Sequence, residues 1–549
     1  MGEDVTRDAR SRRCIGIVRW ALVAGFAGAA LHRISRPGPL YDEILFVNAA
    51  LGGIDGSFVH STVLGVPFML MSYVGALKAW LHAPVFALFG VSIETLRAPS
   101  ILIVCATLLI LSRLGERLFG WRAGLLLTLV LVTDPLSLTT ARVDYGPVVL
   151  AGLFKAASVA LLFAWLERPS AGGVAALVAV LALGVFDKLN FVWFVLALGG
   201  AALLVERRRF VAALRASRPA VWLPIAVGAG ALLYVGGFVV LPLLLGPGPG
   251  GDFPSTTLAE RALALPTLVR TTLDGSAWWR IAFRTPAPAR PEWATLEVSG
   301  LVVVASCAVL SSGVRGIRDA EVRRLARLAA FFAVLCALLL VQLAATPQAN
   351  GPHHAAMLHP WPAFALLATG ATLVAAMPSR ARRRVGAGAS LLVLVVVAGQ
   401  VRFDAAYLAQ LRDRGAIQSW ASTAIYGLSR DLERLAPDLV VSADWGLHNQ
   451  LFALAPPASR RRHRNLYALL QDGADLEQAT AELAAALQSG KRVAVVLHPE
   501  DETMMRRARE RVLAFAARRP PGSFARWPVT DASGHTVYEV LFLEPSAAP

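Results

Sequence analysis

Residues 326–345 read ARLAAFFAVLCALLLVQLAA, and this stretch contains one charged residue, Arg327. A helix rises about 1.5 Å per residue, so about 20 apolar residues cross the hydrocarbon core of a bilayer. The stretch is therefore predicted to be a membrane-spanning helix. The whole chain agrees, because 56% of its 549 residues are hydrophobic and 16% are charged. Soluble proteins average about 45–50% apolar and about 25% charged residues.

Further apolar stretches of similar length bring the expected number of spans to about 11. We therefore expect an α-helical polytopic membrane domain over residues 1–401, with long outer loops at 35–96 and 246–297. The other expected spans are 15–34, 98–114, 121–140, 145–166, 172–186, 190–205, 220–245, 298–314, 358–377 and 385–401.

The basic residues predict the orientation of these spans. The net charge is +16, and most of the excess lies in alternate loops, around 7–19, 113–122, 207–218, 315–327 and 380–384. Lysine and arginine collect in cytoplasmic loops. This pattern predicts an N-terminus inside and a C-terminus outside, and it leaves no basic excess that would indicate a nucleic-acid partner.

Residues 63–91 are apolar but are interrupted by Pro67, Lys78, His82 and Pro84. A single crossing here would reverse every later loop, so the segment must cross zero times or twice. We expect amphipathic helices that lie on the outer surface of the bilayer.

Acidic residues follow two of the expected spans on the outer side. Asp42 and Glu43 come shortly after the first span, and Asp144 lies between the third and fourth. Carboxylates at a membrane boundary are costly and suit a general base or a divalent-metal site. They also suit helix N-termini, and for Asp144 a salt bridge with Arg142 is an equally simple explanation.

Cationic and imidazole side chains lie at the same level. Lys188 can hold a phosphate as a point charge, or pair locally with Asp187. The adjacent His353 and His354 do not share a helical face, so they make a poor zinc pair and are better suited to donating hydrogen bonds to a phosphate or sugar. A loop with no function remains an open alternative for them.

The order of these motifs resembles the GT-C glycosyltransferases, specifically the bacterial relatives of protein O-mannosyltransferases and of lipid A aminoarabinose transferase. The resemblance covers roughly residues 10–400. It rests on the acidic pair after the first span, FGVSIETLRAPS at 89–100, Arg122 after an FGW turn, ARVD at 141–144, the Asp187-Lys188 turn, and the His353-His354 loop followed by Pro360.

The resemblance implies a transferase that moves a sugar from a polyprenyl-phosphate donor on the outer face of the bacterial plasma (inner) membrane. By resemblance, Asp42 is the base, Glu43 supports it or binds metal, and Asp144 orients the acceptor or completes a metal site. Lys188, Arg97, His353 and His354 are the expected ligands of the donor phosphate. A divalent metal, Mg or Mn, held by Asp42 and Asp144 is left open, and no other cofactor is expected.

Residues 402–549 have a soluble composition and contain no cysteine. Strands expected at 438–444, 492–498 and 536–543, with a helix at 501–518, indicate a small extracytoplasmic α/β domain. Asp444 and His448 follow the first strand, where α/β sheets often bind ligands. They are candidates for binding a lipid, glycan or protein acceptor, although ordinary loop polarity explains them equally well.

Two other classes of protein fit the spans. A secondary transporter or lipid flippase is the main alternative, and Lys155, in the middle of the fourth span, favours it. A non-catalytic membrane assembly or sensor protein is the third. The clustering of the singled-out charges at the outer ends of the spans favours the transferase.

Overall fold

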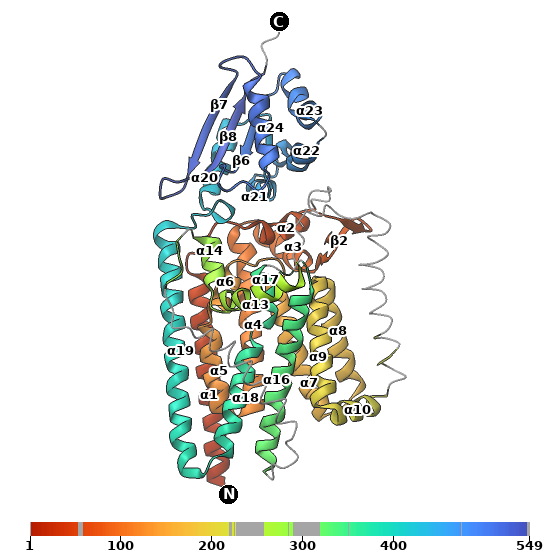
Figure 1. The fold of residues 1–549 in the computed structure, drawn as a ribbon, viewed down its shortest axis with the longest axis vertical. Coiled ribbons are helices and arrows are strands. Elements are labelled where there is room, and N and C mark those ends of the chain that lie inside the picture. The colour runs from red at the N-terminus through yellow and green to blue at the C-terminus, as the bar shows by residue number, and fades with distance from the viewer. Residues whose placement is uncertain are drawn as a thin grey trace.

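The computed structural model describes residues 2–52, 59–218, 257–288 and 319–545, apart from residues 284, 348, 350 and 474, and it also describes residues 222, 223 and 226. Its main body is a bundle of long helices with the N-terminus at one end (Figure 1). The last described residues, which end at 545, lie beyond the opposite end of the bundle, next to a mixed sheet that is covered by helices. The first and last described segments therefore lie on opposite sides of the bundle.

Long apolar helices make up the bundle, and they coincide with nine of the expected spans. They are α1 (Gly2–Leu31), α4 (Ile93–Phe119), α5 (Trp121–Val132) with α6 (Pro135–Arg142), α7 (Val148–Glu167), α8 (Ala171–Asp187), α9 (Val192–Val205), α16 (Ala320–Ala345), α18 (Trp361–Ala376) and α19 (Ser379–Arg414).

Within the described residues, six helices are long and apolar enough to cross a membrane, or up to eight if each bent pair forms one span. The α8 helix is apolar but shorter. The expected spans at 220–245 and 298–314 fall almost wholly outside the described residues, so the total of about eleven stays a prediction. The protein is a multi-pass, membrane-embedded helical bundle.

The two bends have local causes. Asp134 caps α6 by accepting hydrogen bonds from the backbone N–H groups of Leu136 and Ser137, and Pro135 occupies the first helical position. The axis turns by 50° there. At Glu206 the chain turns by 105° into α10 (Arg207–Ala216), an arginine-rich helix at the end of the bundle opposite the sheet (Figure 1).

A layer formed by the first long loop lies between the bundle and the sheet (Figure 1). It contains α2 (Tyr41–Ala50), the strands β1 (Ser61–Val63), β2 (Val66–Met71) and β3 (Val74–Gly75), and α3 (Leu77–Phe89). Only α3 matches the surface helices expected over 63–91, and the expectation was wrong for the first part of that segment. Its residues pair as antiparallel strands around a tight turn in which Leu64 and Gly65 both have positive φ, as a two-residue type I′ hairpin turn requires.

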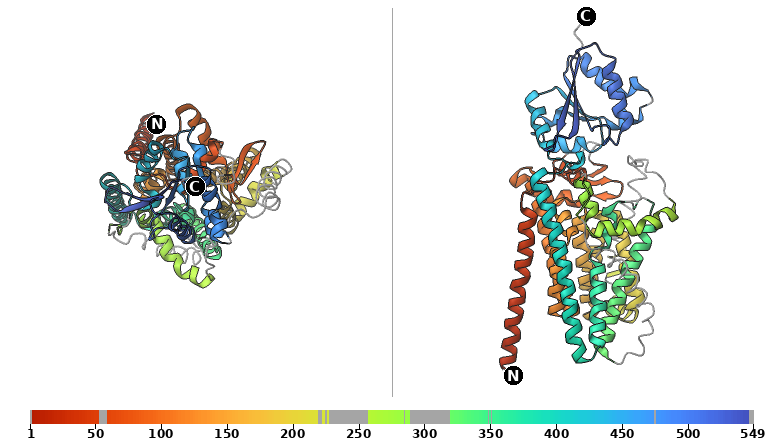
Figure 2. Two further views of the ribbon diagram at one scale, coloured as in Figure 1. Left: turned by 90° about the horizontal axis from the view of Figure 1, so that it is seen from above. Right: turned by 60° about the vertical axis from the view of Figure 1, so that its left-hand side comes forward.

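The tail carries a five-stranded sheet in the order β5-β4-β6-β8-β7. Its strands are β4 (Leu439–Ser442), β5 (His463–Asn465), β6 (Val493–Leu497), β7 (Phe524–Thr530) and β8 (Thr536–Leu543), and the first three run parallel. Helices α20 (Ala424–Leu435) and α21 (Leu447–Leu454) cover one face, and α22 (Tyr467–Asp472), α23 (Leu476–Gln488) and α24 (Arg506–Ala517) the other. Figure 2 shows this unit standing over the bundle. We call it the tail domain.

The tail domain rests on the first-loop layer through α21. Asn48 on α2 donates a hydrogen bond to the carbonyl oxygen of Asn449 at 3.1 Å, and Gln450 donates to the carbonyl oxygen of Pro39 at 2.6 Å. The rings of Tyr41 and Trp445 lie 4.2 Å apart between their centroids. The α19 helix continues beyond residue 401, where we placed the domain boundary, to Arg414.

Candidate functional site

The turn that leads into α2 is held by two buried arginines from other helices. Arg97 on α4 donates hydrogen bonds to the carbonyl oxygens of Ile34, Pro37 and Gly38, at 2.7, 2.8 and 3.0 Å. Arg142, at the end of α6, donates to the carbonyl oxygens at positions 30, 32, 33 and 36. The backbone preceding Asp42 is therefore fixed from two sides.

Glu43 is bound within the same network. Its Oε1 atom lies 2.5 Å from Nη2 of Arg97, its Oε2 atom accepts from Nε at 3.1 Å, and Oε1 also accepts from the backbone N–H of Leu40. The side chains of Glu43 and Arg97 are each 1% exposed. Two residues that we expected to act on the substrate thus have their charged groups directed at each other and at the backbone.

Asp42 projects from the first turn of α2 and is half-buried. Burial raises the pKa of its carboxyl above the ordinary value. The charges of Lys188 and Lys78 act in the opposite direction, whereas Asp144 and Glu43 add to the rise. These charges come from four separate segments, so the structure brings Asp42, Asp144 and Lys188 together.

Asp144 is already paired, with a residue that the sequence had not singled out for the site. Nζ of Lys78, on α3, lies 2.8 Å from its Oδ2 atom, and both side chains are 2% exposed. Its Oδ1 atom accepts hydrogen bonds from the backbone N–H groups of Val148 and Val149, at the start of α7. Asp144 therefore caps a helix, as one alternative held, but its ion pair is with Lys78 rather than Arg142.

Lys188 follows α8 and is attached to the first-loop layer. Lys188 pairs with Val74 in an isolated antiparallel bridge, and the N–H of Leu189 donates to the carbonyl oxygen of Tyr73 at 3.0 Å. Gly75 allows this close approach, because a Cβ atom there would lie 2.2 Å from the carbonyl oxygen of Phe186. Burial lowers the pKa of Lys188, and the carboxylates of Asp42, Asp187 and Asp144 raise it.

Asp187 is a further carboxylate of this cluster. It is fully buried, and neither of its carboxylate oxygens has a hydrogen-bond partner. The charges of Lys78, Lys188 and Asp144 all act on it. We expected Asp187 only as a local partner of Lys188, and the structure adds it to the group of charges around Asp42.

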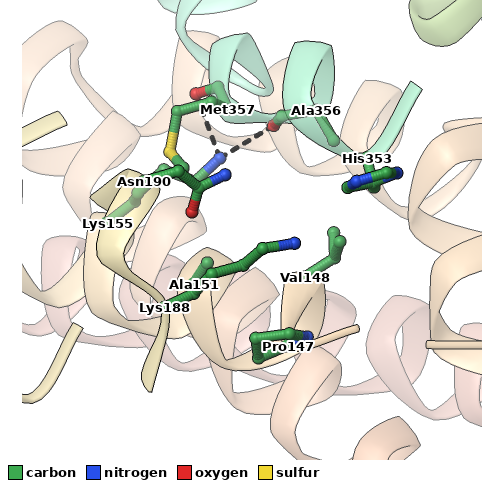
Figure 3. A pocket seen from close by; sticks show the side chains of 9 residues that line it. All are labelled: Pro147, Val148, Ala151, Lys155, Lys188, Asn190, His353, Ala356 and Met357. Atoms are coloured by element: carbon green, nitrogen blue, oxygen red, sulfur yellow. Dashed lines mark hydrogen bonds between the residues drawn. The ribbon is translucent and has the colours of Figure 1, made fainter. Parts of the chain in front are cut away.

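The paired histidines lie on α17 (Pro352–Ala355), and His353 lines a pocket (Figure 3). Lys188 points into the same pocket (Figure 3). The two side chains interact electrostatically. His354 turns to Asn190, with 3.3 Å between its Nδ1 atom and the side-chain nitrogen of Asn190. The other lining residues are Pro147, Val148, Ala151, Lys155, Ala356 and Met357.

Asp444 and His448, the two candidates in the tail domain, make their contacts with other residues of that domain. The carboxylate of Asp444, after β4, accepts hydrogen bonds from the backbone N–H groups of Trp445 and Met505 and from the hydroxyl of Thr503. It therefore fixes two loops at the end of the parallel strands. His448 lies buried on α21, where its ring packs against Phe452.

The donor atoms around Asp42 fit a divalent cation poorly. Both oxygens of Asp144 are engaged, one by the Lys78 ammonium and one by two backbone N–H groups. Within the part of the chain that the structure describes, one group of three metal-ligating side chains converges, and it lies in the tail domain at Asp501, Glu502 and His535. The carboxylates of Asp42 and Asp144 therefore do not form a suitable site for a divalent metal.

Sequence reasoning missed Lys78 because it appeared only as an interruption of an apolar segment. A lysine within an apolar stretch at a membrane boundary is costly unless it is paired, and this was the signal that could have found it. Its partner lies 66 positions later in the chain, so no local pattern pointed to it.

Comparisons with known proteins agree with this architecture. Residues 75–234 match the family model described as dolichyl-phosphate-mannose-protein mannosyltransferase. The crystal structure of ArnT from Cupriavidus metallidurans in the apo state has a TM-score of 0.51 and 14% sequence identity, and the match covers 97% of this chain and 98% of that chain. No curated protein sequence gives a significant match.

Two further solved structures are similar over 97% of this chain. ArnT from Cupriavidus metallidurans bound to undecaprenyl phosphate has a TM-score of 0.48 at 14% identity, with 98% of that chain covered. The archaeal oligosaccharyltransferase AglB from Archaeoglobus fulgidus, in complex with an inhibitory peptide and a dolichol-phosphate, has a TM-score of 0.47 at 12% identity, with 75% of that chain covered.

The family match and the ArnT fold bear out the resemblance that the motifs suggested. The chain is therefore similar in fold to the ArnT structure, and residues 75–234 are similar to the dolichyl-phosphate-mannose-protein mannosyltransferase family.

Proposed function

We propose that the protein transfers a sugar from a polyprenyl-phosphate donor to an acceptor on the outer, periplasmic face of the bacterial plasma membrane. The observation that carries the proposal is the gathering of Asp42, Asp144, Lys78 and Lys188, from four separate segments, beneath the tail domain. The match of residues 75–234 to a family described by a lipid-phosphate-linked sugar donor supports the same donor class.

Lys188 and His353 are the groups that we assign to the donor phosphate. Breaking the bond between the anomeric carbon and the phosphate oxygen leaves negative charge on the lipid phosphate, and cations or hydrogen-bond donors that face it lower the barrier. Lys188 supplies a charge and His353 a ring nitrogen from opposite sides of one pocket (Figure 3). His354, which contacts Asn190, supports the turn that carries His353.

Asp42 is the general base in this proposal. The acceptor oxygen or nitrogen forms its bond to the anomeric carbon, the bond from that carbon to the phosphate oxygen breaks, and the acceptor proton passes to Asp42. A base acts best when its pKa lies near the working pH. Burial raises the pKa of Asp42 in that direction, and the side chain is only partly buried, which leaves access for an acceptor.

Glu43, Arg97 and Asp144 take positioning roles in this scheme. The Arg97–Glu43 pair fixes the turn before Asp42, and the Lys78–Asp144 pair fixes the start of α7 next to Lys188. The tail domain lies over α2 through Trp445 and Asn449. We propose that it shapes the acceptor side, with Asp444 fixing the loop of Trp445, whose ring packs on Tyr41 of α2.

The test is transfer of a radiolabelled sugar from polyprenyl-phosphate donors in membranes that contain the protein. Asp42→Asn removes the base and is expected to lower kcat by about 10²- to 10⁴-fold. The matched control is Asp413→Asn, because Asp413 is an exposed aspartate on α19 whose partner is the neighbouring Arg412. Full transfer by Asp42→Asn, or equal losses in the two variants, would remove Asp42 as the base.

A further inference from the structure

Lys155 lies in the middle of α7, and the chemistry proposed above does not use it. Its side chain is almost wholly buried. The ammonium donates hydrogen bonds to three backbone carbonyl oxygens, those of Ala356 at 2.9 Å, Met357 at 3.1 Å and His359 at 2.7 Å. Two of these bonds are drawn in Figure 3. Lys155 thus reaches about 200 positions along the chain to one short turn.

These contacts give hydrogen-bond partners both to the Lys155 ammonium and to the three carbonyl oxygens. An ammonium has three donors, and a buried one is costly unless each donor is paired. The three acceptors lie in and just after the short helix η4 (Ala356–Leu358), which continues α17. The last carbonyl groups of a helix have no partner within it, and a cation there is favourable. Lys155 therefore acts as a C-terminal cap for the α17–η4 segment.

The segment held in this way carries His353. The start of α17 is closed by a hydrogen bond from the N–H of His354 to the carbonyl oxygen of Gly351, at 3.0 Å. Gly351 leaves room for the His353 ring, because a Cβ atom at Gly351 would lie 2.5 Å from it. The place of the ring relative to Lys188 thus depends on where the α17–η4 segment sits. Lys155 fixes the C-terminal end of that segment.

Lys155 is also distinct from the other buried cations near the site. Lys78 pairs with Asp144 and Arg97 pairs with Glu43, whereas the hydrogen bonds of Lys155 all go to backbone oxygens. Replacing its side chain therefore leaves no carboxylate without a partner. The residue can be tested without disturbing the ion pairs around Asp42.

We propose that Lys155 is a positioning residue for donor binding, which holds the α17–η4 segment so that His353 faces Lys188 across the pocket. The inference rests on the proposed function, because it takes the pocket to be the site of the donor phosphate. It also gives Lys155 a role that has no connection with transport.

The first experiment compares kinetic constants of the purified full-length protein. Lys155→Met removes the three hydrogen bonds, and we expect the KM for the polyprenyl-phosphate donor to rise by about 10- to 100-fold, the size of effect that a misplacement near 1 Å produces. The KM for the acceptor should not change. Lys491→Met is the control, because Lys491 is exposed on the tail domain. A folded Lys155→Met protein with an unchanged donor KM would overturn the proposal.

A double-mutant cycle with His353→Ala separates positioning from a direct effect of the charge. If Lys155 acts through His353, adding Lys155→Met to His353→Ala should raise the donor KM no further. Additive effects would overturn the proposal. If Lys155→Met does not fold, Lys155→Gln takes its place. Its shorter side chain has two N–H donors against the three of the ammonium, so it cannot make all three hydrogen bonds, and the same two outcomes decide.

The same data distinguish a failure of the proposed function. If His353→Ala itself leaves the donor KM unchanged, the assignment of the pocket to the donor phosphate fails. If His353→Ala raises the donor KM and Lys155→Met does not, the pocket assignment stands and the role of Lys155 is wrong.

Discussion

Arg97 on α4 and Glu43 on α2 form a buried ion pair with two contacts, Nη2 to Oε1 at 2.5 Å and Nε to Oε2 at 3.1 Å. The remaining donors of Arg97 go to the carbonyl oxygens of the turn between α1 and α2. Asp42 therefore stands on a backbone whose preceding turn and following residue are both fixed. The pair explains why two charged residues beside the proposed base are better suited to holding it than to touching a substrate.

Arg97→Met is expected to destabilise the protein. It leaves the Glu43 carboxylate buried without its cation, and breaking a buried pair costs about 3–5 kcal/mol. The measurement is the thermal unfolding midpoint in detergent. Arg412→Met, which removes an exposed pair with Asp413, should leave that midpoint nearly unchanged. Normal stability together with lost donor binding in Arg97→Met would instead support direct contact between Arg97 and the phosphate.

The acid side of the pH profile should report the Asp42 carboxyl. The base works when it is deprotonated, so activity is present above its pKa and lost as the pH falls through it. Lys188 lowers this pKa, so Lys188→Met should move the acid limb of kcat/KM to higher pH. Asp144 raises it, so Asp144→Asn should move the limb to lower pH. An acid limb that stays in place in both variants would argue against Asp42 as the titrating base.

The Lys78–Asp144 pair should behave as a coupled unit. Lys78→Met alone leaves Asp144 buried without its cation, and a loss of about 3–5 kcal/mol is expected. Lys78→Met combined with Asp144→Asn should cost less than the sum of the two single changes, because neither group is then left charged and unpaired. The comparison of unfolding midpoints in all four proteins tests this, and strict additivity would speak against the pair.

Gly75→Ala should displace the Lys188 turn. A Cβ atom at Gly75 would lie 2.2 Å from the carbonyl oxygen of Phe186, and this backbone can only move away. We expect a loss of stability of about 1–3 kcal/mol and a higher donor KM. Gly152→Ala is the control, because nothing lies within 4 Å of a Cβ atom there. A donor KM that is the same in the two variants would show that the β3 contact does not set Lys188.

The predicted orientation has a direct test. A reporter that is active only in the periplasm, fused after residue 549, should be active if the tail domain lies outside. A second fusion within α10, which lies at the other end of the bundle, should be silent. The reverse result for both fusions would show that the arginine-rich loops face the periplasm and not the cytoplasm.

Local patterns in the sequence predicted those parts of the structure that depend on length and hydropathy. Nine of the expected spans coincide with helices, because a run of about 20 apolar residues has few other stable arrangements. The strands β4, β6 and β8 were likewise expected from their residues. Asp42, Asp144 and Lys188 were identified as candidates because charged side chains at a membrane boundary are energetically costly and therefore often functional.

Local sequence patterns could not predict contacts between segments that are distant in the chain. The pairing of β2 with β1 and β3 was not expected, because its apolar residues also suit a surface helix. Lys78 and the cap that Lys155 forms both depend on partners far along the chain. Arg97 and Glu43 were assigned to the substrate because their sequence neighbours do not reveal that each is the other's partner.

The contact between Tyr41 and Trp445 has a consequence for the design of chimaeric proteins. The residue next to Asp42 packs on the tail domain, and Asn48 and Gln450 extend the same contact by hydrogen bonds in both directions. A chimaera that takes its tail from a relative must therefore also take the matching face of α2. Replacing the tail domain alone would break these contacts one residue away from Asp42, the proposed base.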